Sequence, residues 1–491
     1  MVRVRYAPSP TGLQHIGGVR TALFNYFFSR SQGGRFILRI EDTDRERYNE
    51  AALQDIYDTF GWLGIEWDEG PDVGGPYGPY LQSERLELYR GFAAQLIEQD
   101  MAYWAYDTPE ELQAMREAQD EKGGGYDRRG RNYTAVQIAD YKARGIVPVV
   151  RFKGALEGET VFEDMILGRV KKKNKDIIAD PVLLKSDGFP TYHLANVIDD
   201  HQMQITHILR AQEWLSSAPL HVQLYQALGW APPLFCHLPM VMGKDGQKLS
   251  KRHGSTSVIE FRRQGYLPEA LINYVIMLGW AYDDKREFFT TDELEKLFDV
   301  AKINKAPAVF DYRKLEWFNG VYIRGKSDDE LQALMVPILV DAGVVSNPMT
   351  DQERQILHAA LPLIRERMKY LTEAPELVRF LYTDDLRYNP EDLIPRKMDA
   401  ASTARMLRAG RSVVTGFEAR ADEENEELLR SKAEELGVKL GSLMMPLRIA
   451  VTGSRVSPPL LGSMRLIGEA RVQQRIDRVL QLLQAKGGTD E

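Results

Sequence analysis

The sequence predicts an α/β fold with a parallel sheet, a region of mixed α and β structure inserted into it, and an all-helical C-terminal half. Three observations lead to this prediction. The N-terminal segment follows the pattern strand, glycine-rich loop, helix, strand; the character of the chain changes between residues 106 and 180; and strand patterns fade after about residue 330. A strand–helix–strand unit with short connections is typical of a parallel sheet.

The N-terminal unit begins at residues 2–6, where apolar residues alternate with arginines as in a strand. Proline and glycine break the pattern, and from Ile16 apolar side chains recur at the spacing of one helix face. An apolar strand at residues 36–40 completes the unit. We therefore expect a Rossmann-type domain made of residues 1–105 and 181–241, with ligands at the carboxyl ends of its strands.

Residues 106–180 have the pattern of an inserted α+β domain. They contain a polar helix at Pro109–Asp120 and a short strand at Val149–Phe152. Strand signals return at residues 182–185 and 205–209. Because the sheet pattern resumes there, we expect the insertion to interrupt the α/β domain.

Long helical patterns, punctuated by glycine and proline, dominate the C-terminal half. We expect a connecting region at residues 242–328 and two helical domains at 329–388 and 389–491. The helices expected within them lie at residues 351–371, 373–381, 399–417, 424–435 and 468–483.

Composition excludes several classes of protein. Cys236 is the only cysteine, so an intramolecular disulfide and a cysteine-based zinc site are both excluded. No apolar run approaches the length that spans a bilayer, and the first residues lack the apolar core of a signal peptide. These features predict a cytoplasmic protein. The net charge of −8 does not exclude nucleic acid, because a summed charge says little about one face.

The first candidate site is the loop at residues 7–18, between the first strand and the first helix. A helix N-terminus offers free N–H groups to phosphates, and Gly12, Gly17 and Gly18 allow close approach of a nucleotide. His15 adds a hydrogen-bond donor. Taken alone, the loop fits nucleotide binding and an ordinary turn with a surface histidine equally well.

The second candidate site is the basic loop Lys244–Arg252, which begins with an Asp-Gly turn signal. A cluster of cations on such a loop can hold a polyphosphate during nucleotidyl transfer without any enzyme nucleophile. Taken alone, the loop is better explained as a solvated basic segment.

Read together, the two loops carry a family resemblance. Residues 15–18 (HIGG) resemble the HIGH signature of class I aminoacyl-tRNA synthetases, and residues 248–252 (KLSKR) resemble their KMSKS signature. Further segments resemble glutamyl-tRNA synthetases of the bacterial type over essentially the whole chain. These segments are residues 5–12, 20–25, 39–45, 185–196 and 446–454.

The resemblance implies an activity. It implies ATP-dependent activation of L-glutamate to glutamyl-adenylate and transfer to the 3′-terminal adenosine of tRNA-Glu, with Mg²⁺ beside ATP, no protein-bound metal and no zinc. Activation is expected to require bound tRNA, and the enzyme is expected to be a monomer without membrane contact. The insertion would hold the acceptor end, residues 242–328 would contact the tRNA stem, and the helical half would read the anticodon.

The resemblance also assigns a glutamate pocket. Arg5 and Arg210 read the γ-carboxylate with help from Tyr192, which suits the bidentate geometry of guanidinium groups. Glu41 receives the α-ammonium. The alternative is that Arg5 and Glu41 form a structural ion pair. The remaining pocket residues implied are Ala7, Ser9 and Asn196.

For ATP, the resemblance places His15 at the phosphates, with Lys248 and Lys251 as further catalytic cations. Glu213 takes the ribose, and the backbone near Val241 takes adenine. Further ATP contacts implied are Thr11, Gly12, Gly17 and Arg252.

In the helical half, Arg367 matches the arginine that family members use to prefer C over U at the third anticodon position. A guanidinium suits that role as a donor to cytosine, although a plain helix-surface arginine explains the residue nearly as well. The same similarity suggests Arg448, Ser457 and Pro458 as anticodon contacts.

The chain departs from the family pattern at Gly18, Leu249, Arg252 and Gln212, the last of which removes an acid beside the ATP site. A glutaminyl enzyme is disfavoured by the two arginines and the helical half, and a catalytically silent tRNA-binding homologue is disfavoured by His15 and the loop lysines. The sequence leaves open whether tRNA-Gln is also charged and what Gln212 changes.

Overall fold

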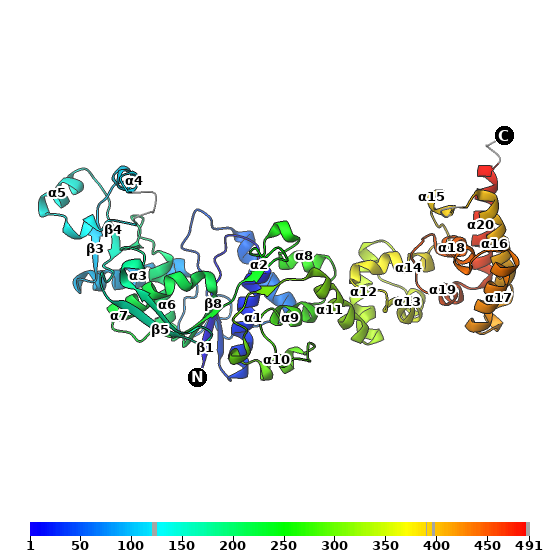
Figure 1. The fold of residues 1–491 in the computed structure, drawn as a ribbon, viewed down its shortest axis with the longest axis horizontal. Coiled ribbons are helices and arrows are strands. Elements are labelled where there is room, and N and C mark those ends of the chain that lie inside the picture. The colour runs from blue at the N-terminus through cyan, green and yellow to red at the C-terminus, as the bar shows by residue number, and fades with distance from the viewer. Residues whose placement is uncertain (120–124, 389, 395–397, 488–491) are drawn as a thin grey trace. The chain divides into compact units, whose positions relative to one another are not determined.

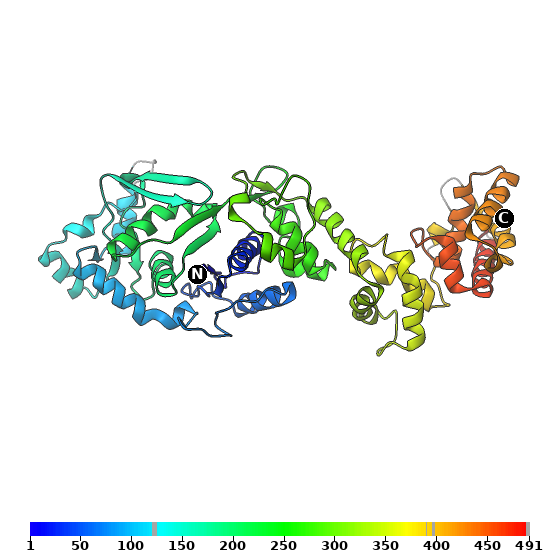
Figure 2. The same cartoon turned by 90° about the horizontal axis from the view of Figure 1, so that it is seen from below.

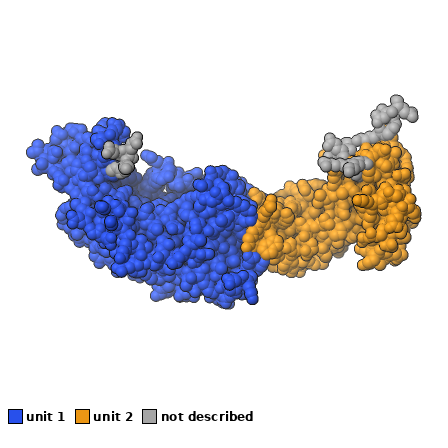
Figure 3. All heavy atoms as spheres, viewed as in Figure 1, with its two compact units in different colours: residues 1–263, 268–312 blue, residues 264–267, 313–491 orange. Residues whose placement is uncertain are grey.

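The computed structural model describes residues 1–119, 125–388, 390–394 and 398–487 (Figure 1). The chain forms two compact units (Figure 3). Unit 1 comprises residues 1–263 and 268–312, and unit 2 comprises residues 264–267 and 313–491. Among the helices of the described residues, none combines the length and the apolar character needed to cross a membrane.

Unit 1 is built around the predicted strand–helix–strand unit. β1 (Arg3–Tyr6) pairs in parallel with β2 (Arg35–Leu38), and α1 (Ile16–Ser31) connects them. α1 is buried on nearly all sides, since β1, β2 and β8 (His207–Ala211) lie against it together with α9 (Pro268–Ile276) and α10 (Thr291–Leu297). Its apolar pattern therefore extends beyond one face.

A second set of parallel strands lies beside this unit, in which β8 (His207–Ala211) pairs in parallel with β9 (Leu234–Leu238). Thr206 Oγ1 accepts a hydrogen bond of 2.8 Å from the Arg3 backbone N–H and so ties β8 beside β1. The Rossmann-type parallel arrangement is thus confirmed. The other elements of this core are α2 (Glu50–Leu63), α3 (Leu86–Glu98), α6 (Tyr192–Gln202), α7 (Ala218–Ala227), α8 (Val258–Arg263), β10 (Val241–Met242) and β11 (Ala308–Val309).

Two sheets contain the strands of the inserted region. β3 (Ala102–Ala105), β4 (Val149–Phe152) and β7 (Val182–Leu184) form an antiparallel sheet, and β4 has the predicted bounds. β5 (Glu159–Asp164) and β6 (Gly168–Lys173) form a hairpin (Figure 2). Asp164 of β5 pairs in parallel with Phe235 of β9, so this hairpin extends the core sheet.

Two helices accompany these sheets, α4 (Pro109–Glu117) and α5 (Ala135–Ala143). Each begins with a threonine capping box, Thr108 with Glu111 and Thr134 with Gln137. The helix expected at Pro109–Asp120 ends at Glu117 in the structure, and residue 120 lies outside the described residues.

Every regular element described in unit 2 is helical, as the sequence predicts. The helix expected at residues 351–371 is shorter than predicted. It ends at Ile364, because the chain then turns so that the Leu371 N–H donates to the Gly265 carbonyl at 3.1 Å. The helices are α11 (Tyr312–Gly325, beginning in unit 1), α12 (Asp328–Asp341), α13 (Asp351–Ile364), α14 (Ala374–Tyr382), α15 (Pro390–Leu393), α16 (Ala400–Val414), α17 (Asp422–Glu435), α18 (Leu440–Thr452), α19 (Leu460–Ile467) and α20 (Glu469–Gly487).

Candidate active site

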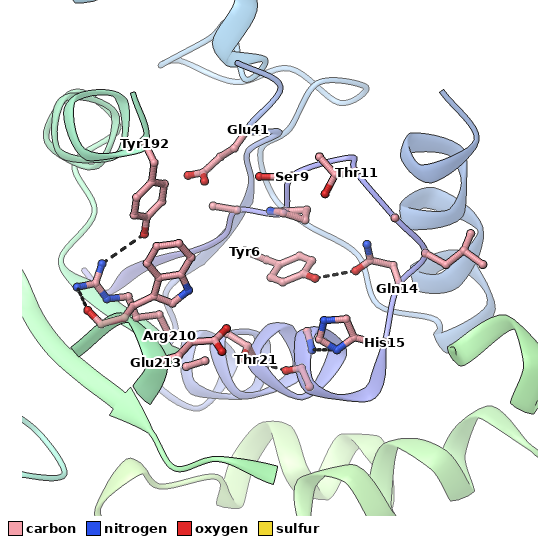
Figure 4. Close-up of a pocket in the computed structure, with 18 of the residues that line it drawn as sticks. Tyr6, Ser9, Thr11, Gln14, His15, Thr21, Glu41, Tyr192, Arg210 and Glu213 are labelled. Carbon is pink, nitrogen blue, oxygen red and sulfur yellow. Dashed lines mark hydrogen bonds between the residues drawn. The ribbon is translucent and has the colours of Figure 1, made fainter. Parts of the chain in front are cut away.

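A cavity of about 1430 Å³ opens in unit 1. It is lined by residues 5–9 and 11–18, by the chain that follows β2 and β8, by the start of α6 and by residues 248–250 and 254–257 (Figure 4). These segments lie at the carboxyl ends of the parallel strands, where the sequence predicts ligand binding. All the residues predicted to bind glutamate line this cavity.

His15 is the N-cap of α1 and lines the cavity at the end of the loop between β1 and α1. Its Nδ1 accepts a hydrogen bond of 3.2 Å from the Gly18 N–H, so the proton of the neutral ring is on Nε2. Burial lowers the pKa of His15, Lys248 lowers it further, and Glu213 opposes them. The residue therefore serves the cavity as a neutral donor.

Gly18 has a structural reason to be glycine. A Cβ on this residue would lie 2.9 Å from the hydroxyl of Tyr6. That hydroxyl donates a hydrogen bond of 2.6 Å to Gln14 Oε1 and packs beneath the loop. A larger residue would displace Tyr6, which accounts for the departure from the HIGH signature at this position.

The basic loop reaches the same cavity. Lys248 donates a hydrogen bond to Glu213, the acid expected at the ribose, and lies close enough to affect the pKa of His15. The segment that follows the basic loop is tied to the start of α1, where the Ile16 N–H donates to the Thr256 carbonyl at 3.0 Å. The structure thus brings His15, Lys248 and Glu213 together as the sequence predicts. The side chain of Lys251 lies outside the described part of the structure.

Other predicted ATP contacts are arranged around this centre. Thr11 and Gly12 are exposed on the loop, and Gly17 lies against the His15 ring. Arg252 is held away from the cavity lining by an ion pair of 3.3 Å with Asp245. Val241 begins β10, and its carbonyl accepts from the Leu249 N–H at 3.0 Å.

Sequence reasoning missed Arg20, which supports the segment before Val241. Arg20 lies on α1, is 3% exposed, and donates to the Pro239 carbonyl at 2.6 Å. Burial lowers its pKa to about 10. In the sequence, only its position within the pattern of the first helix marks Arg20. That position does not tell whether the side chain is buried and supports another segment or lies on the surface.

The opposite end of the cavity is a buried ion-pair network. Arg5 donates through Nε to Asp200 at 2.9 Å, and Arg39 donates to Asp200 at 2.6 Å and to Glu41 at 3.1 Å. The alternative reading of an Arg5–Glu41 ion pair is wrong, because each of them has a different partner. Burial raises the pKa of Glu41, although Arg39 and Arg5 oppose this. Sequence reasoning missed Asp200 and the structural role of Arg39.

Arg210 lies beside Arg5, and its hydrogen-bond partners are neutral groups. It donates to Tyr192 Oη at 3.4 Å and to the Trp214 carbonyl at 3.2 Å. Burial lowers the pKa of Arg210, and repulsion from Arg5 contributes. A ligand carboxylate placed between the two arginines would offset both effects.

Asn196 gives the clearest sign that this end of the cavity holds a polar ligand. It is 1% exposed, lines the cavity, and neither its Oδ1 nor its Nδ2 has a hydrogen-bond partner among the described residues. An unsatisfied buried amide costs about 1–3 kcal/mol. A ligand that accepts and donates here would remove that cost. Ala7 and Ser9 complete the lining.

Comparison with known proteins identifies the family. The family of class I tRNA synthetases (E and Q), catalytic domain, matches residues 1–317, and an anticodon binding domain matches residues 330–480. The chain is 54% identical to a glutamate–tRNA ligase of Borreliella burgdorferi, covering 96% of this chain and 97% of that protein. It is 50% identical to a glutamate–tRNA ligase of Treponema denticola, with 98% and 99% covered. The chain belongs to the glutamate–tRNA ligases.

A solved structure of a family member supports the same conclusion. The glutamate-tRNA synthetase of Elizabethkingia anophelis superposes with a TM-score of 0.82 at 35% identity, covering 98% of this chain and 99% of that one. This glutamate–tRNA ligase is therefore an aminoacyl-tRNA synthetase of class I, and enzymes of this group use ATP. The glutaminyl alternative is not supported, since the curated relatives are glutamate ligases.

The predicted anticodon contacts of this ligase gather at one place in unit 2. Arg448 donates through one amine to the carbonyls of Ser457 at 3.2 Å and Pro458 at 2.9 Å, and also to the Ser457 hydroxyl. Burial lowers the pKa of Arg448, and the nearby charge of Arg367 lowers it further. Arg367 itself is exposed and lies in the turn after Ile364 rather than on the helix.

Proposed function

We propose that this ligase activates L-glutamate with ATP and transfers the glutamyl group to the 3′-terminal adenosine of tRNA-Glu, using one cavity with two chemically different ends. The observation that carries the assignment of the ends is the buried Arg5–Arg210 pair beside the unsatisfied amide of Asn196. Two guanidinium groups suit a carboxylate better than the neutral amide of glutamine.

Glutamate is placed with its γ-carboxylate between Arg5 and Arg210, where Tyr192 adds a hydroxyl donor. Its α-ammonium lies at Glu41, and the positive charge opposes the effect of burial on the pKa of that carboxyl. Asn196 has both a donor and an acceptor to offer. This pose directs the α-carboxylate toward the loop of residues 7–18. Ala7 and Ser9 form the adjoining wall.

ATP is placed with its phosphates at the N-terminus of α1. An oxygen of the glutamate α-carboxylate attacks the α-phosphorus, the bond to the β-phosphate oxygen breaks, and pyrophosphate leaves. The Nε2–H of His15 and the ammonium groups of Lys248 and Lys251 stabilise the negative charge that develops on the phosphate oxygens. The N–H groups near Gly17 add the favourable end of the helix dipole.

Mg²⁺ enters this proposal with ATP. Within the described residues no group of three or more His, Cys, Asp or Glu side chains is arranged to hold a metal ion. Phosphate oxygens and water are ordinary ligands of Mg²⁺, so the ion needs no dedicated protein cage. When bound, Mg²⁺ would neutralise phosphate charge.

The hydrogen bond between Lys248 and Glu213 suggests a sequence of events. Both side chains are largely exposed, 61% and 44%, so their ion pair is weak and easily exchanged. When the ribose hydroxyls of ATP take Glu213 as their acceptor, Lys248 is released to the phosphates. Nucleotide binding would thus recruit the loop cation.

In the second step, a terminal hydroxyl of tRNA attacks the carbonyl carbon of glutamyl-adenylate and AMP leaves. The inserted region, residues 106–180, is proposed to hold the acceptor end. Arg367 and Arg448, together with Ser457 and Pro458, are proposed to read the anticodon. Arg367 favours discrimination for tRNA-Glu over tRNA-Gln. We further propose that the enzyme is cytoplasmic, acts as a monomer and activates glutamate only with tRNA bound.

The test combines exchange of pyrophosphate into ATP with charging of two tRNA transcripts. We expect glutamate-dependent exchange with tRNA-Glu present, little without it, and charging of tRNA-Glu well above tRNA-Gln. Exchange that is equally fast without tRNA would remove the requirement for tRNA, and equal charging of both transcripts would establish the broader substrate range.

The pocket assignment has its own test in Arg5→Ala. Loss of a buried arginine that contacts a carboxylate is expected to lower kcat/KM for glutamate by about a thousandfold. Binding of ATP, followed by equilibrium dialysis, should stay within about threefold because the two ends of the cavity are separate. Unchanged glutamate activation would contradict the assignment.

A further inference from the structure

Arg210 is held by a chain of buried side chains that the proposed reaction does not use. Its Nε donates to His237 Nε2 at 3.1 Å, and one terminal amine bonds to His221 Nδ1 at 3.1 Å. Beyond these, His237 Nδ1 lies 2.7 Å from Asp164 Oδ2, and His221 Nε2 lies 3.0 Å from His193 Nδ1. Both histidines that contact Arg210 have no exposed surface.

The chemistry of arginine fixes the direction of every hydrogen bond in this chain. A guanidinium only donates, so His237 Nε2 must accept and its proton is on Nδ1, from which it donates to Asp164. In the same way His221 accepts through Nδ1 and donates through Nε2 to His193. Both contacting rings must therefore be neutral, and burial lowers the pKa of each.

This environment differs from that of the neighbouring arginines. Arg5 and Arg39 both pair with the carboxylate of Asp200. Arg210 has no carboxylate within 4.0 Å among the residues that the structure describes, although it is only 4% exposed. A buried guanidinium without a counter-ion is unfavourable, and its charge remains available to an anionic ligand.

We infer that His237 and His221 are positioning residues that make the pocket select a carboxylate over an amide, with Asp164 fixing the proton position of His237. Neutral acceptors hold the guanidinium in place without cancelling its charge. An acidic residue at either position would orient Arg210 equally well but would neutralise it. This inference rests on the proposed function, in which Arg210 binds the γ-carboxylate.

Asp164 has a second role that any test must separate from this one. One of its oxygens accepts from the N–H groups of Ile166 and Leu167, both at 2.9 Å, and so shapes the turn between β5 and β6. A variant of Asp164 could therefore act through the turn alone. The two roles are distinguished by measuring the effect of the Asp164 variant both with His237 present and with glutamine in its place.

The experiment uses the full-length enzyme, tRNA-Glu and pyrophosphate exchange, with Asp164→Asn, His237→Gln and the double variant. The amide introduced by Asp164→Asn can donate to Nδ1 of His237 and so shift the proton of that ring to Nε2, where it opposes the Arg210 donor. We expect Asp164→Asn to raise KM for glutamate about tenfold or more, because a buried donor loses its acceptor. KM for ATP should stay within about twofold, since the ATP end is separate.

Glutamine at position 237 carries an amide oxygen at a reach similar to that of Nε2 and has no tautomers. His237→Gln should therefore keep KM for glutamate within about threefold of wild type, and adding Asp164→Asn to it should cause little further change. His207→Gln, on the strand β8 that also carries Arg210, is the matched control, because His207 bonds to Thr206 and not to Arg210.

An equal rise in KM from Asp164→Asn in both backgrounds would assign the residue to the turn alone and overturn the inference. A parallel rise in KM for ATP would do the same. If the proposed function itself were wrong, the wild-type enzyme would show no glutamate-dependent exchange at all, which separates the two failures. Thermal melting of each variant establishes that the fold is intact.

Discussion

The two ends of the cavity hold their ligands in opposite ways. At the glutamate end, charged groups are buried and each is fixed by partners, as for Arg5, Arg39 and Asp200. At the phosphate end, Lys248 is 61% exposed and pairs with Glu213, which is 44% exposed. A buried charge must be neutralised or oriented by the protein, whereas an exposed one is stabilised by water.

This difference indicates that the glutamate end provides selectivity and that the phosphate end provides exposed side chains that can move. Glutamate and glutamine differ by one polar group, so discrimination needs a preformed, dehydrated site that leaves the wrong ligand unpaired. A triphosphate carries several charges and is attracted to any cation within reach, so loop lysines suffice. Substitutions at the two ends should therefore affect stability, KM and kcat differently.

The largest effect is expected from Arg39→Met at the glutamate end. Removing this fully buried partner leaves the carboxylates of Asp200 and Glu41 less compensated and should lower the free energy of unfolding by about 3–5 kcal/mol. Urea denaturation measures the change. The control is Arg35→Met, whose ion pair with Asp68 is half exposed and worth about 1 kcal/mol or less. Equal shifts for the two variants would remove the distinction between buried and exposed pairs.

At the phosphate end, Lys248→Ala should lower kcat for exchange about 100-fold to 1,000-fold, because one stabilising cation is lost from the transition state. KM for glutamate and the melting temperature should hardly change, since the side chain is exposed. Lys244→Ala is the matched control on the same loop, with its ammonium paired to Asp311. A large rise in KM for glutamate would show that the two ends are coupled.

A smaller effect is expected at the anticodon contacts. Arg367→Ala should raise KM for tRNA-Glu about tenfold, as expected for loss of one base contact, and should reduce the preference for C over U. Exchange at saturating tRNA should be unaffected. Arg430→Ala, an exposed residue paired within α17, is the control. An unchanged preference between the two bases would contradict the role of Arg367.

The smallest effect concerns pH. Burial lowers the pKa of His193 to about 4, and Arg210 contributes. Between pH 6.5 and about 4 the unfolded chain therefore binds a proton that the folded protein does not, so stability falls as pH falls. His193→Gln should weaken this decline in melting temperature relative to wild type between pH 6.5 and 5. A variant with the same slope as wild type would show that His193 does not contribute to it.

Much of the fold followed from local patterns. The strand at residues 149–152, the first strand–helix–strand unit and the helical character of unit 2 depend on periodicity within short segments. The helix at Leu440–Thr452 was not among the expected ones, because Gly441 and Pro446 interrupt its pattern. The helix beginning at Asp351 was predicted too long, because a contact with Gly265 ends it.

For the candidate site, the sequence predicted several of the residues but not their partners. The resemblance located Arg5, Arg210 and Glu41, but it did not reveal what each one pairs with. Asp200 and His237 carry no signature of their own, since one lies within a helix and the other within a buried strand. Their importance depends on neighbours that are distant in sequence.

The sequence by itself determined the class of fold, the two signature loops and the residue types available for a doubly anionic substrate. Tertiary structure decided which carboxylate neutralises which arginine, and that Arg210 is left with neutral partners. The physical reason is that periodicity and turn chemistry act over a few residues, whereas the charge of a buried group depends on side chains that only the complete fold brings within hydrogen-bond distance.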